Sequence, residues 1–170
     1  MIIGRPFLFG KLPAIGDFAV RGLDGARRLA WDHRCTVSMQ QVRRRFGADL
    51  AAVLDETPPL GFLLAPTRAE PCWQAGCVAP SCDRAGRFFP FVVGVAADEA
   101  WHVPASTIAR SLVPVLHAGI AQGLSPDAAL AAIGTALGAP GEKVAIEVMS
   151  PWRDDWIVPA HVPGAQENRR

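Results

Sequence analysis

The segment PSCDRAGRFFPF, residues 80–91, has the composition of a polar loop between two strands. Residues 72–79 before it are mostly apolar and uncharged, and residues 91–96 after it are apolar and rich in β-branched side chains. Asp83 can accept hydrogen bonds from nearby backbone amides, and Gly86 can adopt a positive φ at little cost. The segment therefore predicts two strands joined by a loop, with Arg87 close enough to contact Asp83.

A second segment, FLFGKLPAIGDF at residues 7–18, indicates an apolar strand that runs into a loop rich in glycine and proline. Its Gly10-Lys11 pair invites comparison with a phosphate-binding loop. That motif needs an earlier glycine at the position of Arg5, and Ser or Thr at the position of Leu12. The sequence therefore excludes nucleotide binding by this route.

These two segments resemble the TagF family of type VI secretion-associated proteins from Gram-negative bacteria. The resemblance covers roughly residues 7–100, and this chain departs from it at Phe88, where family members often carry a tyrosine. The shared motifs occur in the same order and with similar spacing: GKLP at 10–13, GDF at 16–18, RGL at 21–23, WD at 31–32, FLLAP at 62–66, and PS at 80–81 followed by Asp83, Gly86, Arg87, Phe89 and Pro90.

The resemblance implies a non-enzymatic regulator. TagF-like proteins act as post-translational repressors of the type VI secretion apparatus, and they are thought to limit its assembly through the cytoplasmic forkhead-associated scaffold protein. The expected partner is therefore a protein, with no nucleic acid and no membrane insertion. Two alternatives stay open, namely a structural or assembly accessory subunit of the apparatus and a small hydrolase that uses Asp17 or Asp83.

The rest of the chain predicts further helices and strands. Residues 24–55 have apolar side chains on one helical face, with Asp24 as N-cap and Gly47 as a kink or break. Pro114 is expected to kink or split a later helix. The other predicted elements are a strand at 61–65, a helix from 105 or 106 to 122, a helix that is capped by Ser125 and ends near 138, and strands at 144–148 and 156–158.

Together these elements predict one α/β (α+β) domain over residues 1–170, with a central, mainly antiparallel sheet. The motif-bearing core is about 7–100, residues 101–162 add helices and strands, and the tail 163–170 is expected to fray. Helices should cover both faces of the sheet, because the run 88–96 shows no polar alternation.

Composition narrows the range of functions that the chain can have. The chain has 17 basic and 16 acidic residues, so charge gives no argument for nucleic acid or an anionic membrane. We see no signal peptide and no apolar run of the ~18 to 20 residues that a membrane span needs, which predicts a cytoplasmic protein. In that compartment the cysteines should be reduced. The sequence contains no Cys-x-x-Cys pair, so we expect no zinc site. Small buried hydrophobes are the expected role of Cys35, Cys72, Cys77 and Cys82.

Catalytic and cofactor motifs are not visible in the sequence. The chain has no Gly-x-Ser-x-Gly turn and no His-Glu-x-x-His, and its four histidines are scattered. We therefore expect no enzymatic activity, no cofactor and no metal. The run at residues 43–45 consists of three arginines, which indicates either a solvated helix face or a partner contact.

The candidate partner-binding residues are charged side chains in otherwise apolar stretches: Lys11, Asp17, Arg21, Asp83 and Arg87. We hypothesise that the loop after the first strand and the Asp83 loop meet at one edge of the sheet. There Asp17 or Asp83 would pair with Arg21 or Arg87. Such pairs either only hold the loops together or shape a surface that binds the partner.

Overall fold

The computed structural model describes residues 2, 4–138 and 145–156. Within them, six strands form one sheet in the order β2-β1-β5-β4-β3-β6. The strands are β1 (Arg5–Lys11), β2 (Phe18–Arg21), β3 (Leu60–Leu64), β4 (Trp73–Cys82), β5 (Phe88–Ala97) and β6 (Val148–Met149). The helices are α1 (Gly25–Phe46), α2 (Leu50–Glu56), α3 (Ala105–Ala121) and α4 (Pro126–Ala136), and a short 3-10 turn, η1 (Gly47–Asp49), joins α1 to α2.

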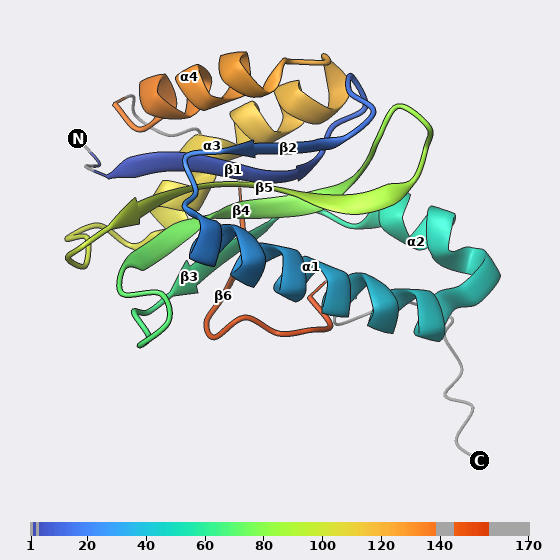
Figure 1. The fold of residues 1–170 in the computed structure, drawn as a ribbon, viewed down its shortest axis with the longest axis horizontal. Helices are drawn as coiled ribbons and strands as arrows, with labels where there is room; N and C mark the ends of the chain where they lie inside the picture. Colours follow the sequence, from blue (N-terminus) through green and yellow to red (C-terminus); the bar gives the residue numbers. More distant parts are fainter. Residues whose placement is uncertain (1, 3, 139–144, 157–170) are drawn as a thin grey trace.

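Neighbouring strands run antiparallel, except that β6 lies parallel to β3. Helices α1 and α2 lie on one face of the sheet, and α3 and α4 cover the other (Figure 1). The predicted fold class is therefore confirmed. Strand β5 is buried from Phe89 to Ala96, which agrees with its lack of polar alternation.

The two faces of the sheet have different cores. Aromatic side chains dominate under α1, where Trp31 contacts Phe7 and Phe62. Aliphatic side chains dominate under α3 and α4. Cys72, directly before β4, belongs to the first core, and Cys77 belongs to the second.

The long predicted helix begins as expected and breaks at Gly47. Asp24 caps α1, because its Oδ1 accepts a hydrogen bond of 2.9 Å from the backbone N–H of Arg27. Gly47 has a φ of 49°, a left-handed conformation that favours glycine, and its N–H donates to the carbonyl of Arg43. The chain then turns through η1 into α2.

Two other details differ from the sequence predictions, and one of the two alternatives predicted at Pro114 is excluded. Strand β2 was not predicted, because its four residues sit beside a Gly/Pro loop and carry no long apolar pattern. Helix α3 is not split at Pro114, which is exposed while both flanking turns are buried against the sheet. Of the strand predicted at 144–148, only residue 148 lies in a strand, β6. Residue 144, most of the strand predicted at 156–158, and the tail 163–170 lie outside the described residues.

Strand β4 is longer than its neighbour β3. The pairing of β3 with β4 ends where Leu60 lies opposite Val78, whereas the pairing of β4 with β5 continues until Cys82 lies opposite Phe88. Residues 79–82 of β4 therefore have a strand partner on one side only, among the described residues. This free edge includes Pro80, a residue that sheets tolerate mainly at edges.

Candidate functional site

The carboxylate of Asp83 lies at the centre of the loop between β4 and β5. Its Oδ1 accepts hydrogen bonds from the backbone N–H groups of Ala85 (2.9 Å) and Arg87 (3.0 Å). Its Oδ2 accepts from Nζ of Lys11 (2.9 Å) and Nε of Arg87 (2.7 Å). The Asp83 side chain is fully buried. These donors, the Lys11 ammonium first, hold the pKa of Asp83 well below its usual range.

Further contacts join this loop to the loop between β1 and β2. The backbone N–H of Arg84 donates to the carbonyl of Ile15 (2.9 Å), and its guanidinium donates to the carbonyl of Ala14 (2.5 Å). The guanidinium of Arg87 also reaches the carbonyl of Gly16 (3.4 Å). The hypothesis that the two loops meet at one end of the sheet is therefore confirmed (Figure 1). We call residues 12–17 and 83–87 the joined loops.

Two glycines make the joined loops possible. Gly86 has a φ of 75°, as the turn predicts. Gly10 has a φ of 128°, and a Cβ atom there would lie 1.9 Å from the carbonyl oxygen of Pro90. Because only glycine fits this close approach, β1 can lie beside β5 and deliver Lys11 to Asp83.

Of the predicted alternative pairings, Asp83 with Arg87 is confirmed, whereas Asp17 and Arg21 have other partners. Asp17 is exposed, and its Oδ1 accepts from the backbone N–H of the next residue, Phe18 (2.7 Å), rather than from an arginine. The guanidinium of Arg21 binds Asp127, in the first turn of α4, at 2.7 and 3.2 Å. Arg21 lies at the opposite end of β2 from Phe18, where its register places it beside Leu8 of β1. This separation keeps Arg21 out of the joined loops.

Exposed side chains surround the buried ion pair. Phe18 is 38% exposed, and its ring contacts Phe89 edge-on with 4.9 Å between centroids. The side chain of Arg87 is 66% exposed, and Arg84 is exposed as well. The resulting surface combines an aromatic ring with two cations, a composition that is common in protein interfaces.

Sequence reasoning overlooked two of these residues. Phe18 and Arg84 both lie within the motif segments, at the end of the predicted Gly/Pro loop and in the predicted turn, but the charge-based choice of site residues named neither of them. A usable signal was the Gly16-Asp17 pair before Phe18, which predicts that the chain turns at the surface there.

The arginine run at 43–45 is exposed in the last turn of α1, and Arg43 donates to the carbonyl of Phe88 (3.1 Å).

The cysteines and acidic residues do not assemble a metal site in the described part of the chain. There, no three His, Cys, Asp or Glu side chains gather closely enough to hold a metal ion. The four cysteines are free, and all but Cys82 are buried. Burial raises the pKa of the Cys35 and Cys77 thiols, which fits their predicted role as small apolar groups. No helix among the described residues is long and apolar enough to cross a membrane.

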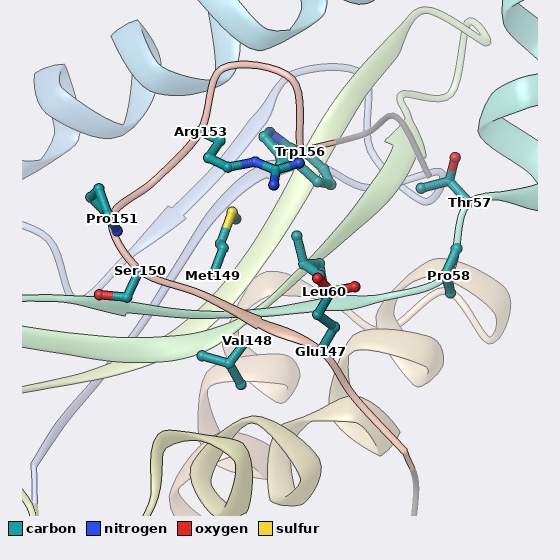
Figure 2. Close-up of a pocket in the computed structure, with 10 residues that line it drawn as sticks. All are labelled: Thr57, Pro58, Leu60, Glu147, Val148, Met149, Ser150, Pro151, Arg153 and Trp156. Carbon is teal, nitrogen blue, oxygen red and sulfur yellow. The ribbon is translucent and has the colours of Figure 1, made fainter. Parts of the chain in front are cut away.

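A cavity of about 290 Å³ lies at the β6 edge of the sheet (Figure 2). The start of β3 and residues 147–156 form its walls, and Leu60, Met149 and Trp156 are apolar parts of its lining. Its charged groups are Glu147 and Arg153, and the Nε of Arg153 donates to Asp155 (3.1 Å). None of the predicted site residues lines this cavity, and neither does any histidine.

Comparisons with known proteins place these features in a family context. Residues 8–139 match the family model of the TagF N-terminal domain, described as type VI secretion system-associated. The crystal structure of PA0076 from Pseudomonas aeruginosa PAO1 at 2.05 Å resolution is similar, with 27% sequence identity and a TM-score of 0.62. The similarity covers 79% of this chain and 63% of that one, so the chain spans less than two thirds of its length. A comparison with curated proteins gave no match.

Proposed function

Because the chain belongs to the TagF N-terminal domain family of type VI secretion-associated proteins, we propose that it is a non-enzymatic, post-translational repressor of type VI secretion. It binds a cytoplasmic protein of the secretion system, the forkhead-associated scaffold, and thereby limits assembly of the apparatus. The joined loops provide the binding surface.

One observation carries this proposal. The family-motif segments, far apart in sequence, meet at one end of the sheet through a buried carboxylate, and their exposed side chains lie around it. Asp83 and Lys11 fix the two loops relative to each other. Asp17, Phe18, Arg84 and Arg87 remain accessible to a partner. A surface that is rigid before binding loses less conformational entropy when the partner docks.

The same geometry argues against a hydrolase. Both oxygens of Asp83 already accept two hydrogen bonds each, and the side chain has no contact with solvent. Asp17 is exposed and is oriented by its neighbour's backbone N–H rather than by a catalytic partner. A general acid or base needs access to the substrate, which the buried Asp83 lacks, and a side chain that orients and activates it, which Asp17 lacks among the described residues.

Binding to the purified scaffold protein from the same bacterium tests the proposal. We expect the double variant Phe18→Ala/Arg87→Ala to bind at least ~10-fold more weakly, since exposed aromatic and arginine residues are frequent hot spots. The fold should persist, because Asp83 keeps Lys11 and two backbone donors. A matched control is Leu29→Ala/Arg28→Ala, which removes an exposed apolar residue and an arginine from α1.

Two further readouts separate the alternatives. A repressor should be absent from the assembled apparatus, and Phe18→Ala/Arg87→Ala should raise secretion in the host. Retention of the chain in purified, assembled apparatus would instead support an accessory subunit. Turnover of esters, phosphates or nucleotides that disappears in Asp17→Ala or Asp83→Ala would support the hydrolase.

A further inference from the structure

A small cavity adjoins the joined loops at the free edge of β4. Its volume is about 140 Å³, much larger than the ~30 Å³ that one water occupies in the liquid. Helix α2 contributes Leu54 and Asp55 to its lining, and helix α3 contributes Ile120. Strand β4 contributes Ser81 and Cys82, the two residues directly before Asp83. The cavity is therefore continuous in sequence with the proposed binding surface.

The cavity exists because β3 stops short. Beyond Val78, β4 has no strand on this side among the described residues, so the ends of α2 and α3 border its edge instead. Pro80 lies on this edge of β4 and has no backbone N–H to donate to a partner strand. A partner at this edge therefore has little backbone to pair with and must bind mainly through a side chain.

Ser81 gives the cavity its polar character. The residue is only 7% exposed, and its hydroxyl oxygen is buried without a hydrogen-bond partner among the described residues. Buried polar groups in folded proteins are nearly always paired, so an unpaired one beside a cavity indicates a missing partner group. Asp55 adds an exposed carboxylate to the same lining, and the remaining side chains include the ring of Phe88.

We propose that this cavity is the anchor pocket of the partner-binding surface and that it takes a tyrosine side chain of the partner. This inference rests on the proposed function. An aromatic ring fits the apolar walls formed by Leu54, Ile120 and Phe88. The phenol oxygen accepts a hydrogen bond from the hydroxyl of Ser81, and the phenol O–H donates to the carboxylate of Asp55.

Cys82 allows the pocket to be tested without any partner. It is half-buried and lines the cavity, whereas Cys35, Cys72 and Cys77 are buried. The Cys82 thiolate attacks one sulfur of a small disulfide, a mixed disulfide forms, and the other half leaves as a thiol. The probes are the symmetrical disulfides of 4-hydroxyphenethyl thiol and phenethyl thiol, which differ only in the phenol hydroxyl.

We expect the hydroxyphenethyl probe to be captured at least fivefold more than the phenethyl probe, at a fixed reductant concentration, by intact-mass measurement. Ser81→Ala should abolish this preference. The matched control is Ser111→Ala, a serine that is also buried but whose hydroxyl already donates to the carbonyl of Thr107 (3.1 Å). Equal capture of both probes would overturn the inference. Cys82→Ser checks that the mixed disulfide forms at this residue.

Binding measurements with the scaffold protein then test whether the pocket belongs to the partner-binding surface. If the scaffold occupies it, bound chain should lose most maleimide labelling of Cys82, and Ser81→Ala should weaken binding several-fold. Scaffold binding that leaves Cys82 labelling and Ser81→Ala affinity unchanged would reject the anchor pocket and leave the proposed function intact. If the scaffold does not bind while the phenol preference holds, the partner of the proposed function is wrong and the chemistry of the pocket stands.

Discussion

Two buried carboxylates lie at the two ends of β4, and they are held in different ways. Asp83, directly after the strand, binds two backbone amides of its own loop, Lys11 and Arg87. Glu70, three residues before the strand, binds only side chains, the guanidinium of Arg34 on α1 and the amide of Gln74. Three of the four hydrogen bonds to Asp83 thus come from its own loop, whereas two of the three to Glu70 come from Arg34 on a separate helix.

The difference has a structural consequence. Glu70 belongs to a chain of contacts that continues into the aromatic core, because Gln74 accepts a hydrogen bond of 2.9 Å from the indole of Trp31. Asp83 instead joins two surface loops, of which residues 16–17 and 84–87 are exposed. One carboxylate locks a helix onto the sheet, and the other shapes the surface that we propose for partner binding.

Removal of the Asp83 carboxylate should have the largest effect. In Asp83→Ala, Lys11 loses its anion in a site where its own side chain is only 12% exposed, and two backbone amides lose their acceptor. We expect a decrease in Tm on the order of 10 °C, measured by thermal denaturation. Asp83→Asn, which keeps the shape and part of the hydrogen bonding, should lose less. A Tm within 2 °C of wild type in Asp83→Ala, about the size expected for a surface pair, would show that the joined loops do not depend on this residue.

Removal of the Glu70 carboxylate should cost less, about 2 kcal/mol in the free energy of unfolding. The reason is that the side chain of Arg34 is 20% exposed and its guanidinium lies 5.2 Å from the centroid of the Trp31 ring. Without Glu70, the guanidinium therefore still contacts water and an aromatic ring. Denaturant unfolding of Glu70→Ala, Arg34→Ala and the double variant checks this. If the two single losses add in full in the double variant, the two residues are not coupled and the comparison fails.

The contrast also explains what the sequence could predict. The Asp83 loop was predictable because Asp, Arg and Gly within five residues encode a turn with its own hydrogen bonds. The pairing of Lys11 with Asp83 was not, because it joins residues 72 positions apart and depends on the register of β1 against β5. The pairing of Arg34 with Glu70 was not predictable either, since nothing in a helical pattern indicates which polar residue meets a loop from elsewhere. Arg21 was assigned to the wrong acid for the same reason.

The exposed pair of Arg21 with Asp127 should contribute less to the Tm than either of the two buried carboxylates. The side chains are 39% and 77% exposed, so water replaces the lost contact when one of them is removed. We expect Arg21→Ala to change the Tm by no more than about 2 °C. A larger decrease in a thermal melt would mean that β2 depends on α4 for its position.

Acid pH should also reveal the Asp83 carboxylate, through the Tm near pH 4. Its pKa is lowered in the folded state relative to about 3.9 in an unfolded chain, so the unfolded state binds more protons below that value. The stabilisation is complete above about pH 5 and decreases as the pH falls through and below pH 4 toward the folded pKa. Between pH 5 and pH 3.5, wild type should lose a few degrees more of Tm than Asp83→Asn. Parallel Tm curves for the two proteins would contradict this assignment.

The strand order implies a sequence of events during synthesis of the chain. Strands β3, β4 and β5 follow one another and pair as neighbours, whereas β1 pairs with β5 across most of the first hundred residues. Contacts between distant residues close slowly because of their loop entropy. We therefore expect the β3–β5 meander to gain amide protection first in pulse-labelled hydrogen exchange, and β1 and β2 to dock afterwards. On the ribosome, β1 then has only β2 as a possible sheet neighbour until β5 has emerged, so the exposed Phe7 and Phe9 are where a chaperone would be needed.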